Sequence, residues 1–324
     1  MKYIILFIFF VVCLSDKKPP LNIQQKVKFG NFKITYLNDE GAFMKPKELY
    51  STSETKFWNE HKNYLNENGN LFIGFGGFLI EIGNQKIIVD TGVGPDETHV
   101  KGIGFVSGGP FMKNLEKAGV KPDQITDVFL SHLHKDNVGW ATTKKNGKYE
   151  LTFPKATYWC NEYEWQSFEK YLQSEKNEVD KDLIARFYEP VKGIIKFISE
   201  TKPLAPGLFP IVCAGHSPGL TVLKLEDKNK RLWILPDLFH TPAEFHDILL
   251  LPDLDHTKFA KESRFIILPE FTRSLAVVAI PRFAPYVFGK ISEENRELVW
   301  DPCTTEECKF YPDEKHLAFQ VEDL

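Results

Sequence analysis

A short stretch that follows a predicted strand carries two histidines and an aspartate, spaced two residues apart. The strand is indicated by the apolar, partly β-branched residues at 128–130. Directly after it come His132, His134 and Asp136, so that one turn brings two imidazoles and a carboxylate together. Zinc-like divalent cations take such nitrogen and oxygen ligands at roughly 2.0–2.2 Å. The stretch therefore predicts a metal site at the carboxyl end of a strand, where α/β folds place their chemistry. The alternative is a pair of turn histidines whose ring nitrogens are satisfied by hydrogen bonds.

The segment at 131–139 resembles the His-x-His-x-Asp-His signature of the metallo-β-lactamase superfamily, with Asn137 where that family has its last histidine. Three more segments are similar to the family and occur in the family's order. They are residues 78–92, which end in Val-Asp-Thr-Gly, the Gly-His-Ser-Pro-Gly loop at 215–219 and the Asp-Leu-Phe-His segment at 237–240. The resemblance covers about residues 28–285 and implies a four-layer α/β/β/α sandwich. The interleaved strands and helices favour the same α/β fold class.

The resemblance also implies a set of metal ligands. The first site is made of imidazoles, from His132, His134 and His216. The second site is made of oxygen ligands, from Asp136, Asn137, Asp237 and Glu270, with the aspartate of the 237–240 segment bridging the two ions. The glutamate is included because the family's last histidine follows a strand, which we expect at 265–268, and no histidine stands there. An amide oxygen is a weaker ligand than an imidazole and suits harder cations. We therefore expect one tightly bound zinc ion and a weak second site, for which manganese and ferrous iron are candidates.

Three further residues are assigned places around this site. Asp90 is similar to an aspartate that fixes the metal loop of the family by hydrogen bonds. His240 either orients the bridging aspartate or contacts the substrate. Trp140 stands where the family has a second glycine, and it either walls the pocket or packs beneath the next strand. Replacing Asn137 by histidine is expected to strengthen the second site, because the change adds a nitrogen ligand next to Asp136.

The expected activity is metal-dependent hydrolysis of an ester, a lactone or a phosphoester. A bound divalent ion lowers the pKa of its water toward ~7 and so provides hydroxide at neutral pH. Asp136 is the expected catalytic residue, because its carboxylate can orient that water or take up its proton. The Asp-x-x-His-x-Pro segment at 237–242 is similar to lactonases and organophosphate hydrolases of the superfamily. The alternative is a secreted binding protein that keeps the fold without catalysis, which the missing histidines favour.

The charge distribution and the N-terminus indicate partners and location. Lys and Arg are interleaved with Asp and Glu at a net charge of −4, so we expect a small-molecule substrate and no nucleic-acid surface. Residues 1–15 contain a lysine, an apolar run and a polar break, which predict a secretory signal peptide. The run is too short for a comfortable membrane span. We expect a secreted or periplasmic protein without membrane contact after cleavage, and the alternative is an uncleaved N-terminal anchor.

The rest of the chain is expected to form one unit. Residues 16–27 form a polar lead-in, and 28–324 form a single domain with a C-terminal extension from about 286. Turn residues predict hairpins at 83–84 and at 227–230, and Gly119 is expected to end a helix at 110–118. Cys303 and Cys308 close a small loop and form the expected disulfide of an exported protein. Cys160 and Cys213 lie in apolar runs that suit buried free thiols equally well.

Overall fold

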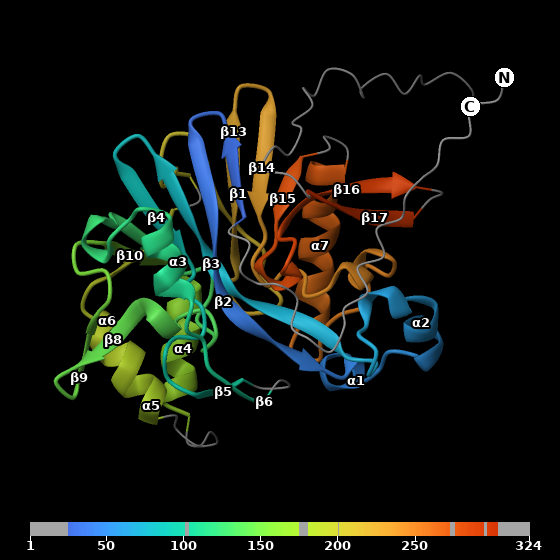
Figure 1. Cartoon of the computed structure of the whole chain (residues 1–324), viewed down its shortest axis with the longest axis horizontal. Helices are drawn as coiled ribbons and strands as arrows, with labels where there is room; N and C mark the ends of the chain where they lie inside the picture. Colours follow the sequence, from blue (N-terminus) through green and yellow to red (C-terminus); the bar gives the residue numbers. More distant parts are fainter. Residues whose placement is uncertain are drawn as a thin grey trace.

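Two mixed β-sheets face each other, and helices cover their outer faces (Figure 1). The structure is a computed structural model that describes residues 25–100, 104–174, 181–199, 201–272, 276–294 and 297–303. The four layers form the α/β/β/α sandwich that the sequence predicted.

Within the described residues, the first sheet has the spatial order β1-β2-β3-β4-β7-β10-β11. Its strands are β1 (Lys26–Phe29), β2 (Phe32–Met44), β3 (Leu71–Ile82), β4 (Gln85–Val89), β7 (Asp127–Phe129), β10 (Thr157–Cys160) and β11 (Ile195–Phe197). The first four strands pair antiparallel, whereas β4, β7, β10 and β11 pair parallel. Parallel neighbours send their carboxyl ends to the same edge, and there the histidine loop begins.

The second sheet has the order β12-β13-β14-β15-β16-β17 among the described residues. Its strands are β12 (Leu208–Val212), β13 (Thr221–Asp227), β14 (Lys230–Ile234), β15 (Val277–Ala279), β16 (Phe288–Glu294) and β17 (Glu297–Pro302). Only the β14–β15 pair is parallel among these described pairings. The predicted extension from about 286 therefore supplies β16 and β17, which complete the second sheet.

Helices and small hairpins surround the sheets. The α-helices are α1 (Pro46–Leu49), α2 (Thr55–Glu60), α3 (Phe111–Lys117), α4 (Glu162–Leu172), α5 (Lys181–Leu183), α6 (Glu189–Val191) and α7 (Thr257–Thr272). The hairpins are β5 (Thr98–Val100) with β6 (Gly104–Val106), and β8 (Thr142–Lys145) with β9 (Lys148–Leu151). Figure 1 shows α3 and α4 on the outer side of the first sheet and α7 on the outer side of the second. These helices also provide the crossovers that parallel strands require.

The alternation of side chains along the strands explains the layers. In β4, Ile87 and Val89 enter the core between the sheets, whereas Ile88 packs with the helices of the first outer layer. In β14, Leu232 and Ile234 enter the same core, and Trp233 packs with the α7 layer. Successive side chains of a strand point to opposite faces, so strands covered on both sides are apolar throughout.

The strand predicted at 265–268 is wrong, because these residues lie within helix α7. A short apolar run does not distinguish a buried strand from a helix segment. The helix buries residues at helical spacing, namely Ala260, Arg264, Ile267 and Phe271, and leaves Ile266 76% exposed. The strand that the run was taken for is β15, which begins nine residues after the end of the run.

Other predictions have mixed outcomes. The hairpins at 83–84 and 227–230 and the helix before Gly119 are confirmed. Cys160 and Cys213 are buried free thiols, and Cys303 is disulfide-bonded, while Cys308 lies outside the described residues. The predicted signal peptide also lies outside them. No helix in the described part of the chain has the length and apolar character to cross a bilayer.

Candidate metal centre

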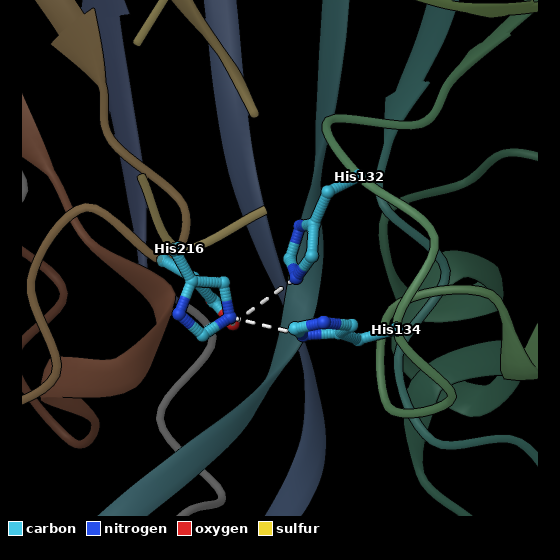
Figure 2. A group of neighbouring side chains, drawn as sticks. His132, His134 and His216 are labelled. Atoms are coloured by element: carbon cyan, nitrogen blue, oxygen red, sulfur yellow. Dashed lines mark hydrogen bonds and ion pairs between the residues drawn. The ribbon is translucent and has the colours of Figure 1, made fainter. Parts of the chain in front are cut away.

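Three loops meet at one edge of the sandwich, and each follows a strand. β7 leads into the loop of His132 and His134, β12 into the loop of His216, and β14 ends three residues before Asp237. Figure 2 shows the first two imidazoles on one side and that of His216 on the other, with the three rings pointing toward one another. The packing of the two sheets therefore brings the predicted first site together.

The spacing of these four side chains fits a zinc-like ion. The ligand atoms of His132, His134, His216 and Asp237 all lie within 4.8 Å of one another. Nδ1 of His134 lies 3.0 Å from Nε2 of His216, and Oδ2 of Asp237 lies 3.3 Å from Nε2 of both His132 and His216. Ligands at roughly 2.0–2.1 Å from a tetrahedral ion are about 3.3–3.4 Å apart. The donor set and its geometry can thus hold one ion.

Acidic side chains behind the imidazoles orient the rings. Asp90 accepts hydrogen bonds from the backbone nitrogen of Ser131 at 2.8 Å and from its hydroxyl at 2.7 Å. The same hydroxyl lies 3.0 Å from Nδ1 of His132. Oδ1 of Asp255 lies 2.9 Å from Nδ1 of His216. Such partners decide which ring nitrogen faces the metal. The structure places Asp90 where the resemblance put it and adds Asp255, which sequence reasoning missed.

A buried glutamate joins the two histidine loops. Glu164 lies in the first turn of α4, where the side chain of Asn161 accepts a hydrogen bond from its backbone nitrogen. The carboxylate of Glu164 accepts from the backbone nitrogens of Leu133 at 3.1 Å and Gly219 at 2.8 Å. A β carbon at Gly219 would lie 2.7 Å from that of Glu164, so only glycine permits this approach. Sequence reasoning missed this residue too, because nothing local marks it.

Arg282 occupies the space between the carboxylates assigned to the second ion. Its Nε donates to Oδ1 of Asp237 at 2.7 Å, and its Nη2 contacts the other oxygen of that carboxylate. Nη2 also lies 2.7 Å from Oδ2 of Asp136. The amide nitrogen of Asn137 lies 3.2 Å from Nε2 of His132, so this side chain faces the imidazole site. The sequence predicted that oxygen ligands here would hold a second metal ion. In the structure the guanidinium of Arg282 lies at this position instead, which corrects that prediction.

The assignment of Glu270 is wrong in this structure. Glu270 lies on the exposed side of α7, where Nη1 of Arg231 contacts its carboxylate at 3.1 Å. It entered the prediction only because α7 was mistaken for the strand before the last ligand. The true strand is β15, which ends at Ala279. Arg282 stands three residues after that end, at the place where the last ligand was expected. An apolar run at 276–280 followed by Pro-Arg is the sequence signal that could have identified it.

Two other assigned residues lie beside the cluster. Trp140 packs in the apolar cluster beneath the first sheet and donates its indole N–H to Asp39 at 3.0 Å, which favours the packing alternative. The ring of His240 lies 4.9 Å from that of His216 between centroids. Nδ1 of His240 is buried and has no hydrogen-bond partner among the described residues. Burial, followed by the neighbouring His216, holds the pKa of His240 well below its usual value, so its ring is neutral.

The charge of the cluster follows from burial and from its acidic partners. Burial alone would lower the pKa of His216, but interactions with Asp237 and Asp255 outweigh burial and raise this pKa to about 10. Burial and the adjacent imidazoles hold the pKa of His134 well below its usual value. Burial would raise the pKa of Asp237, but the Arg282 guanidinium together with His132 and His216 outweighs burial and holds this pKa well below its usual range. Before metal binds, His216 therefore carries a proton at neutral pH.

Zinc binding at pH 7 should release about one proton from His216, because a metal-ligating imidazole must be neutral. In the metal-free protein the imidazolium stabilises the fold fully below pH 6.5, and this contribution is lost as pH rises through about 10. Metal affinity should therefore increase between pH 7 and 9. Calorimetry in buffers of different ionisation enthalpy measures the released protons.

Asp255→Asn is the matched variant for this measurement. It removes one of the two carboxylates that raise the pKa of His216, so fewer protons should be released. Loss of the orienting contact should also weaken metal affinity by roughly 10–100-fold. Binding to the unaltered protein at pH 7 without proton release would contradict the raised pKa.

An apolar pocket of about 620 Å³ opens beside the cluster. His134 and Asp136 are among the residues that line it. Its apolar walls come from Leu133, Phe168, Tyr171, Leu183, Pro218 and Leu254. Ser217 also borders the pocket, and its buried hydroxyl oxygen has no hydrogen-bond partner among the described residues. The pocket can therefore bind an apolar group while presenting polar groups to a reacting centre.

The order and geometry of these segments agree with a comparison to known families. A sequence profile described as the metallo-beta-lactamase superfamily matches residues 77–271. The chain belongs to the metallo-β-lactamase superfamily. The matched range begins in β3 and ends in α7, so it includes the loops of all four clustered side chains. No match was found among curated proteins.

Solved structures show the same fold in hydrolases. The dizinc quorum-quenching lactonase AidC has a TM-score of 0.74 at 20% identity, over 87% of this chain and 98% of AidC. The hydrolase AbOPH of the β-lactamase superfamily has a TM-score of 0.69 at 22% identity, over 88% and 98%. A probable metal-dependent hydrolase from Staphylococcus aureus has a TM-score of 0.71 at 20% identity, over 86% and 99%. At 20–22% identity, this likeness shows that the three proteins share the fold of this chain.

Proposed function

We propose that the protein is a metal-dependent hydrolase of esters or lactones that carry an apolar acyl group. The observation that carries this proposal is the position of the metal-ligand group. His134, one of its imidazoles, lines an apolar pocket of about 620 Å³ together with the carboxylate of Asp136. The lactonase AidC, whose fold is similar, was solved with an acyl-homoserine product, which supports an acyl lactone over a phosphoester.

The chain's own residues have distinct tasks in this proposal. A bound divalent ion supplies Lewis acidity and a nucleophile at neutral pH. Asp136 lines the pocket while Arg282 fixes its carboxylate, so it can accept a proton at a defined position. Phe168 and the other apolar walls hold the acyl group and exclude water. His240 does not line the pocket, and its neutral ring packs beside His216 in support of that ligand.

The zinc-loaded protein should hydrolyse lactones with medium-length acyl chains faster than short-chain lactones and phosphotriesters. Each methylene bound in an apolar pocket contributes about 1 kcal/mol to discrimination. A pH-indicator assay with a panel of lactones, an aryl ester and a phosphotriester measures the preference. Phe168→Ala should reduce kcat/KM for long chains about tenfold or more and leave short chains nearly unchanged. Tyr163→Ala, at an exposed position of the same helix, is the matched control.

A catalytically degenerate binding protein is the second candidate. Asn137 in the metal loop and Arg282 between the two carboxylates depart from a site with two ions, and both observations favour it. The same panel separates the candidates. Metal-loaded protein that binds an acyl lactone tightly and turns none over would establish the binding protein and overturn the hydrolase.

The same proposal includes export from the cytoplasm. It rests on the apolar run and the polar break within residues 1–15, together with the disulfide at Cys303. Zinc remains the metal that we propose, because three imidazoles and one carboxylate form its preferred donor set.

A further inference from the structure

The two acidic side chains beside the imidazole site are buried and need a compensating cation. Asp136 is 4% exposed and Asp237 is 1% exposed. Ionised carboxylates at such depth persist only when they are paired with positive charge or bound to a metal. Within the described residues, the cation that contacts both is Arg282, itself 4% exposed. One guanidinium thus neutralises part of the charge that a second metal ion would neutralise.

The sheet register explains why this guanidinium lies where it does. β14 and β15 are parallel, and Ile234 pairs with Ala279. Asp237 follows Ile234 by three residues, and Arg282 follows Ala279 by three residues. Both side chains therefore leave the same edge of the sheet side by side. The strand register therefore places Arg282 in the site in the same way that it places Asp237.

The surrounding structure holds the guanidinium in place. Nη1 of Arg282 donates to the carbonyl oxygen of Gly74 at 3.4 Å, and the guanidinium lies 5.3 Å from the ring centroid of Phe75. The hydroxyl of Tyr36 donates to the carbonyl of Phe75 at 2.8 Å and lies 3.3 Å from that of Pro281. A β carbon at Gly74 would lie 2.8 Å from the carbonyl of Pro281. Strand β3 therefore fixes this turn, and the arginine has little freedom to move aside for an ion.

We infer that the guanidinium of Arg282 is a built-in second cation, so that the chain holds a single metal ion in the imidazole site. Arg282 occupies the acidic site in place of a second ion, pairs with the carboxylates of Asp136 and Asp237, and fixes their orientation. The inference rests on the metal binding that the proposed function requires, but it does not depend on the substrate. It also corrects the expectation for Asn137→His. That change alone should not add a second ion, because the guanidinium still fills the site.

Metal stoichiometry tests the inference without an activity assay. The unaltered protein, dialysed against excess zinc and then desalted, should retain one ion per chain by elemental analysis. The double variant Asn137→His, Arg282→His should retain two, because it removes the guanidinium and adds two imidazoles near Asp136 and Asp237. Asn137→His alone should retain one. Arg282→Lys, which keeps a positive charge, should also retain one.

Cobalt(II) gives an independent readout, because its visible absorption distinguishes a four-coordinate imidazole site from a six-coordinate oxygen-rich site. Titration of the unaltered protein should end at one equivalent with a single spectrum. The double variant should show a second spectral component between one and two equivalents. Circular dichroism and gel filtration confirm that each variant is folded before its metal is counted.

The outcomes separate this inference from the proposed function. Two ions in the unaltered protein, or one ion in a folded double variant, would overturn the role of Arg282 and leave metal-dependent hydrolysis intact. An unaltered protein that retains no ion would overturn both the single-ion site and the proposed hydrolase. One ion in the unaltered protein and two in the double variant would support the inference whether or not a lactone is hydrolysed.

Discussion

His216→Ala should reduce the bound metal from about one ion to less than about a tenth of an ion per chain, because a zinc site of three imidazoles and one carboxylate loses a ligand. Hydrolysis of any substrate should fall to the background of the assay, since the metal supplies the nucleophile. Zinc at roughly a thousand times its dissociation constant stabilises a protein by about 4 kcal/mol. The variant should therefore lose a zinc-dependent stabilisation of that size. Elemental analysis and denaturant unfolding with and without zinc measure the two effects.

His61→Ala is the control for this variant. His61 lies at the end of α2 and is not among the clustered metal ligands, so its replacement should leave the metal content at one ion. A His216→Ala protein that keeps a full ion and the zinc-dependent stabilisation would show that the ion is held elsewhere. Because the result concerns stoichiometry and unfolding, it does not depend on knowing the substrate.

Gly139→Ala should lower the free energy of unfolding by about 3 kcal/mol or more, because a β carbon there would overlap the backbone carbonyl of Val93. The backbone nitrogen of Gly139 donates to the carbonyl of Gly92 at 2.8 Å, and that of Trp140 donates to the carbonyl of Thr91 at 3.0 Å. These bonds tie the metal loop to the segment after β4. If the two segments separate, metal affinity should fall with stability. Urea unfolding and zinc titration measure the two quantities.

Gly193→Ala is the matched control, because a β carbon at Gly193 meets no atom within 4 Å. Gly193 also lies on the surface, away from the clustered ligands. Its replacement should change the unfolding free energy by less than about 1 kcal/mol and leave zinc binding unaltered. Equal and small effects from the two substitutions would show that the contact with Val93 relaxes without cost.

The sequence predicted the features that depend on neighbouring residues. The hairpins at 83–84 and 227–230 are marked by turn residues between apolar runs, and both form as expected. The histidine loop is local as well, since His132 and His134 lie within one turn after β7. The ordered motifs also identified His216 and Asp237, and the structure brings these two side chains to the first pair.

The side chains that complete the site are remote in the sequence and have no motif. Asp255 lies 39 residues from His216, and Arg282 lies 45 residues from Asp237. Their contacts depend on where the loop before α7 packs and on the register of β15 against β14. Neither is encoded by a local pattern, because a register arises from the packing of whole sheets.

The wrong assignment of Glu270 as a ligand also separates what the sequence predicts from what only tertiary packing decides. The apolar residues at 265–268 fit both a strand and a helix, and only packing against the second sheet decides for α7. Because these residues form part of α7, Glu270 lies on the surface. The strand before the site is β15 instead, and Arg282 lies at the edge of the sheet beside Asp237. The sequence alone thus determined which imidazoles can bind a metal. The tertiary structure decided that the neighbouring site is filled by a guanidinium, because the pairing of two parallel strands fixes what lies next to that aspartate.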